Sequence, residues 1–150
     1  MTLLDRFIGE KGRRSRVEAL VAQRLVSGNH ELAEELADRA EVLAVSAGHM
    51  LITQGADDND IYFILAGTFD VVVNGRRVAG RGAGDRVGEM AAVQPAQRRS
   101  ATVTALEDAI VAKVSQDAFS NLGSRYPQLY RLIAQELAGR VLEFESRLIE

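Results

Sequence analysis

The first 45 residues of the chain carry apolar side chains at helical spacing. Apolar positions that recur every three or four residues form one face of an α-helix. The turn residues Ser27-Gly28-Asn29 are expected to end a first helix, and a second helix is predicted over residues 31–44. The apolar residues of these two faces are Val17, Leu20, Val21, Leu25, Leu32, Leu36 and Ala40.

From Ala47 to Val114 the apolar runs become short and are separated by turn residues, which is typical of β-strands. Asn74-Gly75 is the strongest hairpin signal, because a tight primed turn needs positive φ at both central residues. Strands this short and closely spaced favour an antiparallel roll or barrel. The predicted strands cover residues 49–53, 61–65, 69–73, 76–79, 100–104 and 109–114.

Helical spacing returns after Ser115. A short helix is predicted over residues 116–122, ended by Gly123-Ser124, and Pro127 suits the first turn of a longer helix. A long amphipathic helix at a chain end has to bury its apolar face on the roll, on a partner chain or on both. The fold class is therefore α+β, an antiparallel jelly-roll-like β-roll of about eight strands flanked by N-terminal helices and a long C-terminal helix. The apolar face of that last helix consists of Leu129, Ile133, Leu137, Val141, Phe144 and Leu148.

The length and the net charge of the chain limit the classes of function that it can have. The chain has 150 residues, enough for one domain with its own core, and a net charge of −3. Because a nucleic-acid surface normally shows a basic excess, we expect no nucleic-acid partner. We interpret the basic cluster formed by Lys11, Arg13, Arg14 and Arg16 as a solvated helix face or a partner contact.

Other classes are excluded by residue types that the sequence lacks. It has no cysteine, which excludes disulfides and thiolate metal sites and fits a cytoplasmic location. His30 and His49 show no metal-binding spacing, so we expect neither a metal nor a cofactor. No apolar run reaches the roughly 18 residues of a membrane span, so we expect no membrane partner. The segment Met1–Phe7 is too short, and with Asp5 and Arg6 too charged, for a signal peptide.

The segment from Gly80 to Val103 carries the candidate chemistry. Glycines at positions 80, 82, 84 and 88 are weak evidence for phosphate binding, because no dinucleotide or triphosphate spacing surrounds them and turns explain them as well. The sharper signal is Val87-Gly88-Glu89-Met90-Ala91-Ala92, followed ten residues after Glu89 by Arg99-Ser100-Ala101-Thr102-Val103. Gly88 lets the backbone approach a ligand closely.

These residue types suit a small anionic nucleotide. Residues 89–92 are expected to form a short helix whose free N–H groups face an anion. The Glu89 carboxylate can accept a hydrogen bond from a sugar hydroxyl, and Arg99 can pair with a phosphodiester oxygen through its planar guanidinium. Ser100 can add a hydroxyl contact. The alternatives are an ordinary surface ion pair between Glu89 and Arg99, and Arg98 as the phosphate ligand.

The segment resembles the phosphate-binding cassette of the cyclic nucleotide-binding domain family, which includes bacterial catabolite activators, regulatory subunits of cAMP-dependent kinase and cyclic nucleotide-gated channels. The resemblance implies a ligand-binding domain over residues 30–150, preceded by a helical extension over residues 1–29. The matching motifs are Leu51-Ile52-x-Gln54-Gly55, Ile61-Tyr62-Phe63-Ile64-x-x-Gly67 and Gly84-Asp85-x-Val87-Gly88-Glu89.

The resemblance also implies roles for single residues. Glu89 would bind the ribose 2′-hydroxyl, and Arg99 with Ser100 would bind the cyclic phosphate. Val78 and Ala79 would line the base side of the roll, and the last helix would act as a lid. The candidate ligand-binding residues are Val87, Gly88, Glu89, Met90, Ala91, Arg99, Ser100, Ala101, Val78, Ala79, Arg140 and Phe144. For Arg140 and Phe144 the alternative to capping the base is packing between two lid helices.

Departures from the family pattern bear on the ligand. Arg86 stands where the family usually has an aromatic or apolar residue. Phe144 and Glu145 stand where catabolite activators present hydroxyls to adenine, which argues against cAMP. The roll is similar to the sensor domains of bacterial anti-phage effectors that respond to cyclic pyrimidine nucleotides, in which a TIR domain destroys NAD. This resemblance implies cUMP or cCMP as the ligand and a fused output domain.

The sequence leaves other functions open. The exposed apolar face of the last helix predicts a homodimer. One alternative is a cAMP- or cGMP-sensing regulatory domain of a transcription factor, and another is a ligand-free dimerisation scaffold. An enzyme that uses Glu89 as a general base is disfavoured, because no nucleophile, metal cluster or second carboxylate accompanies it. We therefore expect no catalysis from this chain itself.

Overall fold

The computed structural model describes residues 1–149, and the centre of this part is a roll of two antiparallel four-stranded sheets. The first sheet has the strand order β1-β8-β3-β6 and the second the order β2-β7-β4-β5. The predicted α+β roll of about eight strands is thereby confirmed. The strands are β1 (Glu41–Val45), β2 (Met50–Ile52), β3 (Ile61–Ala66), β4 (Thr68–Val73), β5 (Arg76–Gly82), β6 (Arg86–Val87), β7 (Thr102–Ala105) and β8 (Ala109–Val114).

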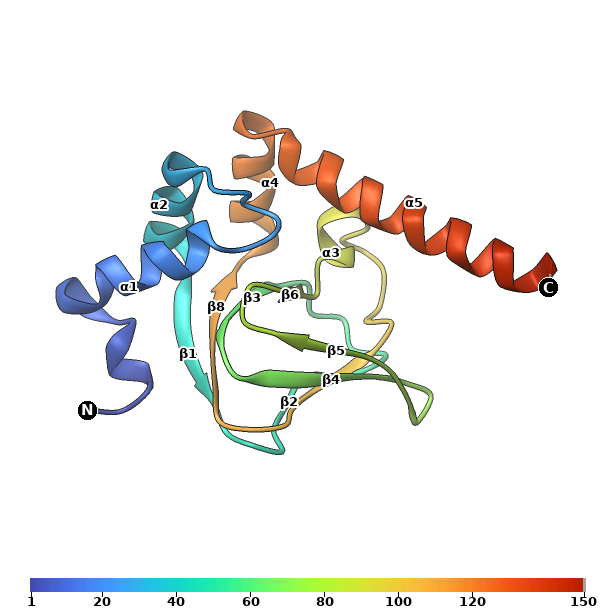
Figure 1. Cartoon of the computed structure of the whole chain (residues 1–150), viewed down its shortest axis with the longest axis horizontal. Coiled ribbons are helices and arrows are strands. Elements are labelled where there is room, and N and C mark those ends of the chain that lie inside the picture. Colours follow the sequence, from blue (N-terminus) through green and yellow to red (C-terminus); the bar gives the residue numbers. More distant parts are fainter. Residues whose placement is uncertain (150) are drawn as a thin grey trace.

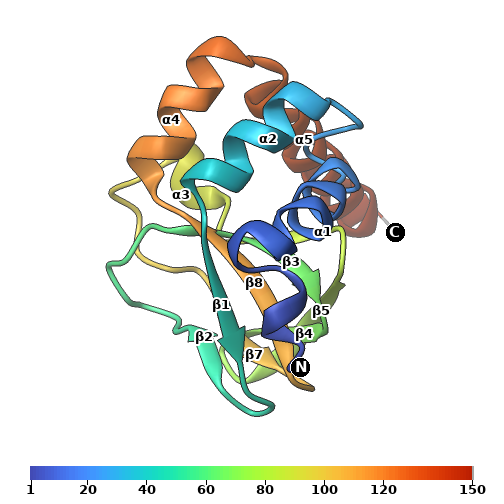
Figure 2. The same ribbon diagram turned by 90° about the vertical axis from the view of Figure 1, so that its left-hand side faces the viewer.

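Most of the helices gather at one end of the roll (Figure 1, Figure 2). The last helix starts at this end and runs outward past the roll toward the C-terminus (Figure 1). The short helix α3 follows strand β6. The helices are η1 (Leu4–Arg6), α1 (Gly9–Val21), α2 (His30–Arg39), α3 (Met90–Val93), α4 (Gln116–Arg125) and α5 (Gln128–Ile149).

Two apolar clusters hold these layers together. One lies between the two sheets and includes Phe69 and Val111, which have no exposed surface. The other joins the first sheet to the helices and includes Leu20 of α1, Phe119 of α4 and Leu129 of α5. Helix α1 therefore packs into the same unit as the roll, while the boundary between residues 29 and 30 stays a prediction.

Strand β3 explains how one apolar run serves both clusters. Ile61, Phe63 and Leu65 belong to the cluster with the helices, whereas Tyr62 and Ile64 belong to the cluster between the sheets. Successive side chains of a strand point to opposite faces. A strand buried on both faces is therefore apolar without interruption, as the sequence 61–65 is.

The structure corrects three predicted boundaries. Residues 41–45 are not the end of a helix but strand β1, which pairs with β8 from Glu41 opposite Lys113 to Val45 opposite Ala109. Leu25 lies in the turn after α1 rather than in the helix, although it is fully buried. Helix α4 continues through Gly123 to Arg125, and the ring of Tyr130 packs directly against this glycine, where a Cβ would clash with it.

Helix α5 has a buried start and an exposed end. Leu129 and Ile133 are buried, whereas Val141, Phe144 and Leu148 are 55–70% exposed. At the joint before α5, the Tyr126 hydroxyl donates a hydrogen bond of 2.6 Å to Glu35 of α2, which raises the pKa of Tyr126 to about 12. The start of α5 is thus fixed to the body of the domain. Among residues 1–149, no helix combines the length and the hydropathy that a transmembrane span requires.

Candidate functional site

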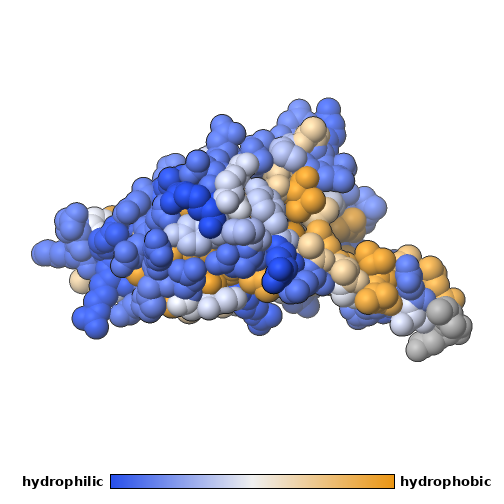
Figure 3. Space-filling view, turned by 90° about the horizontal axis from the view of Figure 1, so that it is seen from above, coloured by the Kyte–Doolittle hydropathy of each residue, from blue (hydrophilic) through white to orange (hydrophobic). Residues whose placement is uncertain are grey.

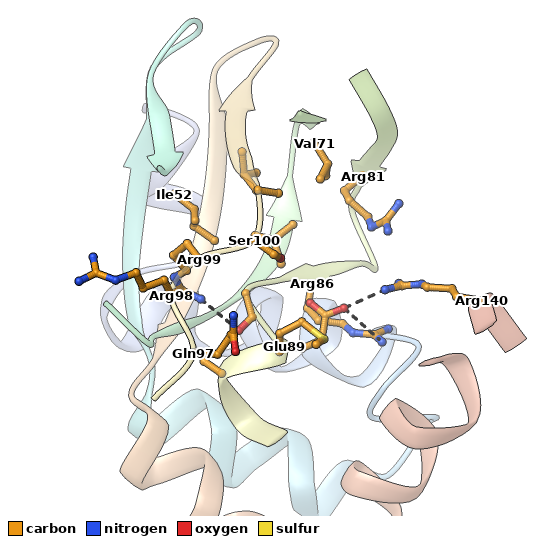
Figure 4. Close-up of a pocket in the computed structure, with 16 residues that line it drawn as sticks. Ile52, Val71, Arg81, Arg86, Glu89, Gln97, Arg98, Arg99, Ser100 and Arg140 are labelled. Atoms are coloured by element: carbon orange, nitrogen blue, oxygen red, sulfur yellow. Dashed lines mark hydrogen bonds and ion pairs between the residues drawn. The ribbon is translucent and has the colours of Figure 1, made fainter. Parts of the chain in front are cut away.

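A cavity opens where the second sheet, the segment around α3 and helix α5 meet (Figure 4). Its apolar floor crosses three neighbouring strands: Ile52 is paired with Val103, and Val103 with Val71. Directly paired residues share one face of a sheet, so these side chains form a row. The residues that line the cavity are Ile52, Val71, Arg81, Arg86, Val87, Gly88, Glu89, Met90, Ala91, Gln97, Arg98, Arg99, Ser100, Ala101, Val103 and Arg140.

Gly88 brings the backbone close to the cavity wall. Its φ is +83°, and a Cβ at this position would lie 2.8 Å from the carbonyl oxygen of Asp60 and 2.9 Å from Nη1 of Arg99. Only glycine adopts this conformation without strain and without a clash. The short helix predicted over residues 89–92 is confirmed as α3, shifted by one residue to Met90–Val93.

Arg99 is buried at one end of the cavity and held by several groups. Its Nη2 donates hydrogen bonds to the Asp58 carboxylate at 2.9 Å and to the Asp60 carbonyl at 2.6 Å. Its Nη1 donates to the Gly88 carbonyl at 3.2 Å, and Nε also donates to Asp58. The Arg99 side chain is 5% exposed, and these hydrogen bonds fix its positive charge at the cavity wall.

The neighbouring Arg98 lies differently. Its side chain is 69% exposed and pairs with Asp57 on the surface, and its Nη1 donates to the Gly55 carbonyl. Figure 4 shows it extending away from the cavity centre. The two residues follow each other in the loop before β7, yet the side chain of Arg98 is exposed and that of Arg99 is buried. This geometry favours Arg99 over Arg98 as the residue that faces a bound anion.

Glu89 lies at the other end of the cavity and is 8% exposed. Its Oε1 lies 3.9 Å from Nη2 of Arg86 and 3.8 Å from Nη2 of Arg140, which reaches across from α5. Among the described residues, no ion pair joins Glu89 to Arg99, so the alternative of an ordinary pair between them is wrong. Both contacts of Glu89 are longer than a hydrogen bond, so its lone pairs can accept a hydroxyl.

Arg86 connects this end of the cavity to the last helix. It is 6% exposed, and its guanidinium donates hydrogen bonds to both carboxylate oxygens of Glu136 on α5. The hydrogen bond from Arg86 lowers the pKa of Glu136 below its ordinary value. Burial of an arginine is costly unless it is paired, so Glu136 compensates the charge that the sequence places in β6.

The structure brings nine of the twelve predicted ligand-binding residues to this cavity. These are Val87, Gly88, Glu89, Met90, Ala91, Arg99, Ser100, Ala101 and Arg140. The other three do not line it. Val78 is 57% exposed at an irregularity of β5, and Ala79 is paired with Val71 at the edge of the floor. Phe144 is 62% exposed and lies about one helical turn beyond Arg140 on α5. Their role as ligand contacts stays a prediction.

Sequence reasoning missed part of the lining. Ile52, Val71 and Val103 come from three separate strands, and only the pairing of these strands shows that they share a face. Arg81 is directly opposite the buried Phe69, so it belongs to the inward face of β5. The alternation of the strand could have revealed this residue. No group of described residues is arranged to hold a metal ion.

Comparison with known families agrees with this architecture. The sequence model of the cyclic nucleotide-binding domain matches residues 42–126, which include the roll and the whole segment around α3. The chain is 53% identical to the Pycsar effector protein BcPycTIR of Burkholderia cepacia, over 94% of this chain and 46% of that protein. It is 45% identical to PaPycTIR of Pseudomonas aeruginosa, over 93% of this chain and 45% of that protein. The chain thus spans less than half the length of these relatives.

Solved structures share the fold. The regulatory domain of Toxoplasma gondii PKA with cAMP superimposes with a TM-score of 0.74 at 20% identity, over 85% of this chain and 50% of that one. The catabolite activator protein of Thermus thermophilus gives a TM-score of 0.70 at 24% identity, over 79% of this chain and 57% of that one. At these identities the similarity concerns the fold alone.

Proposed function

This chain belongs to the cyclic nucleotide-binding domain family, and we propose that it is the sensor part of an effector, binding a cyclic mononucleotide in the cavity beside α3 and passing the signal through α5. In this proposal Arg99 and Ser100 bind the cyclic phosphate and Glu89 binds the ribose 2′-hydroxyl. The chain itself acts by binding and carries out no reaction.

One observation carries the proposal. A buried guanidinium and a buried carboxylate face the same cavity from opposite ends and are not paired with each other. A cyclic nucleotide offers a matching pair of groups, an anionic diester and a hydroxyl donor, on one rigid ring system. The apolar row of Ile52, Val103 and Val71 lies between the two ends and suits the face of the sugar and base.

We further propose a cyclic pyrimidine, cUMP or cCMP, as the ligand and a fused TIR domain that degrades NAD as the output, in defence against phage. Support comes from the names of the relatives, which are Pycsar effector proteins with TIR in their designations, and from their greater length. We place this sensor in the cytoplasm, where its nucleotide ligand would be made.

The same helix that senses the ligand is proposed to form a homodimer. The end of α5 presents an apolar surface, seen on the projecting helix in Figure 3, that includes Val141, Leu142, Phe144 and Leu148. Exposed apolar surface of this kind is stabilised by pairing with a second copy. Light scattering after size exclusion should give the mass of a dimer for the wild type and of a monomer for Phe144→Glu. An unchanged mass in the variant would exclude this interface.

Titration calorimetry with cUMP, cCMP, cAMP and cGMP tests the function. We expect a cyclic pyrimidine to bind most tightly. Arg99→Ala removes charge-assisted hydrogen bonds of about 1.5–3 kcal/mol each, so it should weaken binding at least tenfold. Arg98→Ala is the matched control, since this neighbouring guanidinium is exposed, and it should leave the affinity nearly unchanged.

The other outcomes separate the alternatives. A preference for cAMP or cGMP would replace the defence sensor by the regulatory domain of a transcription factor. Binding of none of the four nucleotides would leave the dimerisation scaffold as the better account.

A further inference from the structure

The partners of Arg86 come from two separate parts of the fold. The residue lies in β6, directly before the segment that carries Glu89, and only 6% of it is exposed. Both carboxylate oxygens of Glu136 accept hydrogen bonds from its guanidinium, whereas Glu89 lies 3.9 Å away. Its Nε is buried without a hydrogen-bond partner among the described residues. The stability of this buried charge therefore depends mainly on a carboxylate that α5 supplies.

The position of α5 consequently decides what Arg86 does to Glu89. While α5 is docked, Glu136 holds the guanidinium and keeps it beyond hydrogen-bond distance of Glu89. If α5 moves away, the buried guanidinium loses its hydrogen-bonded carboxylate, and Glu89 is the acceptor within reach. A direct pair between Arg86 and Glu89 would occupy the lone pairs that a ligand hydroxyl needs.

We propose that Arg86 is a positioning residue that couples Glu89 to helix α5 through Glu136, so that ligand binding at Glu89 and docking of α5 stabilise each other. The proposal rests on the function proposed above, because there Glu89 is the group that binds the ribose. The coupling is reciprocal: if docking of α5 raises the affinity by some factor, the ligand favours the docked helix by the same factor.

A second contact runs from α5 to the same carboxylate but differs in burial. Arg140 approaches Glu89 at 3.8 Å and its side chain is 49% exposed, whereas that of Arg86 is 6% exposed. Salt and water screen exposed pairs much more than buried ones. The contact through Arg86 is therefore the one that should persist at physiological ionic strength.

The test compares two glutamates of α5. Glu136→Gln removes the charge that holds Arg86, and Glu136 is exposed enough for this change to leave the fold intact. Glu143→Gln is the control, because Glu143 pairs with Arg147 of the same helix at 2.8 Å and forms no ion pair with Arg86 among the described residues. In the ligand-free protein, hydrogen–deuterium exchange of residues 134–142 should be faster in Glu136→Gln and unchanged in Glu143→Gln. The affinity for the cyclic nucleotide should fall about fivefold or more in the first variant only.

A double-mutant cycle separates coupling from a merely structural role. In an Arg86→Leu background no guanidinium competes for Glu89, so adding Glu136→Gln should no longer change the affinity. A loss of affinity as large as in the wild-type background would overturn the coupling, as would unchanged exchange of α5 in Glu136→Gln. Failure of the wild type to bind any cyclic nucleotide would overturn the proposed function instead, and the ligand-free exchange distinguishes the two cases.

Discussion

The two charged ends of the cavity are held in different ways. Arg99 makes hydrogen bonds of 2.6–3.2 Å to Asp58 and to the carbonyls of Asp60 and Gly88, all of which belong to the roll. Among residues 1–149, Glu89 has two ion contacts: one at 3.8 Å to Arg140 of α5, and one at 3.9 Å to Arg86 of β6, which is itself hydrogen-bonded to Glu136 of α5. The end at Arg99 is therefore held by the roll, whereas the end at Glu89 is held partly by helix α5, which runs outward from the roll.

This difference suggests a division of labour. A preorganised guanidinium costs little to bring into position, so the end at Arg99 suits the task of capturing an anion. A ligand shifts a conformational equilibrium only if it binds the two states with different affinity. Because the surroundings of Glu89 change with α5, contacts at this end are the ones that can differ between two positions of the helix.

The largest effect is expected at Gly88, because its carbonyl accepts a hydrogen bond from Arg99 and it directly precedes Glu89. Gly88→Ala places a Cβ 2.8 Å from the Asp60 carbonyl and 2.9 Å from Nη1 of Arg99, at a φ of +83°. The strain amounts to about 1–3 kcal/mol, and displacement of Arg99 should weaken binding of every cyclic nucleotide about 100-fold. Thermal unfolding and calorimetry measure the two effects.

Gly139→Ala provides the control for this substitution. Gly139 lies in the exposed part of α5, where an added Cβ meets nothing within 4 Å. Because alanine is about 1 kcal/mol more favourable than glycine in a helix, the change should stabilise α5 and leave the affinity for cyclic nucleotides unchanged. If Gly88→Ala binds like the wild type, the close approach of the backbone at this point has no role in ligand binding.

A smaller effect is expected when the ribose 2′-hydroxyl of the ligand is removed, and this loss of affinity should depend on Glu89 alone. A 2′-deoxy cyclic nucleotide loses a hydrogen bond to a charged group, worth about 1.5–3 kcal/mol, so it should bind the wild type roughly tenfold or more weakly. In Glu89→Gln the penalty for the missing hydroxyl should shrink to a few-fold. Arg99→Lys should retain the full penalty, because it alters only the other end. An equal penalty in all three proteins would remove Glu89 from the ribose site.

The two ends of the cavity also differ in how much of their surroundings the sequence predicts. Arg99 and Glu89 could be assigned because both lie in one continuous segment whose spacing is set by local turns and a short helix. The resemblance to the family pattern already favours Arg99 over Arg98, and the structure adds the physical difference between them: the Arg98 side chain is 69% exposed and that of Arg99 is 5% exposed.

The parts that the sequence did not predict depend on contacts between distant segments. Arg86 stands out in the sequence as a departure from the family pattern, but its partner Glu136 is 50 positions away and the pairing depends on where α5 lies against the roll. The sequence predicts a helix over residues 31–44, whose pattern runs without a break into strand β1, and only pairing with β8 makes Glu41–Val45 extended. In strand β1, therefore, tertiary contacts override local propensity.

The smallest effect is expected from a change of pH on the free energy of unfolding, and it concerns only the Glu89 end of the cavity, where Arg86 pairs with Glu136 of α5. The hydrogen bond from Arg86 lowers the pKa of Glu136, so the stabilisation from this pair is complete above the ordinary carboxyl pKa of about 4.3 and is lost as the pH falls through the lower folded value. The difference in unfolding free energy between the wild type and Glu136→Gln, at most about 1 kcal/mol for a partly exposed carboxylate, should therefore be constant from near-neutral pH down to about 5 and vanish in stronger acid. Chemical unfolding of both proteins across this range measures it, and Glu143→Gln should show no comparable difference. A difference that persists in strong acid would mean that the Glu136 side chain stabilises α5 by packing rather than by its charge, and the contrast between the two ends of the cavity would then lose its electrostatic basis.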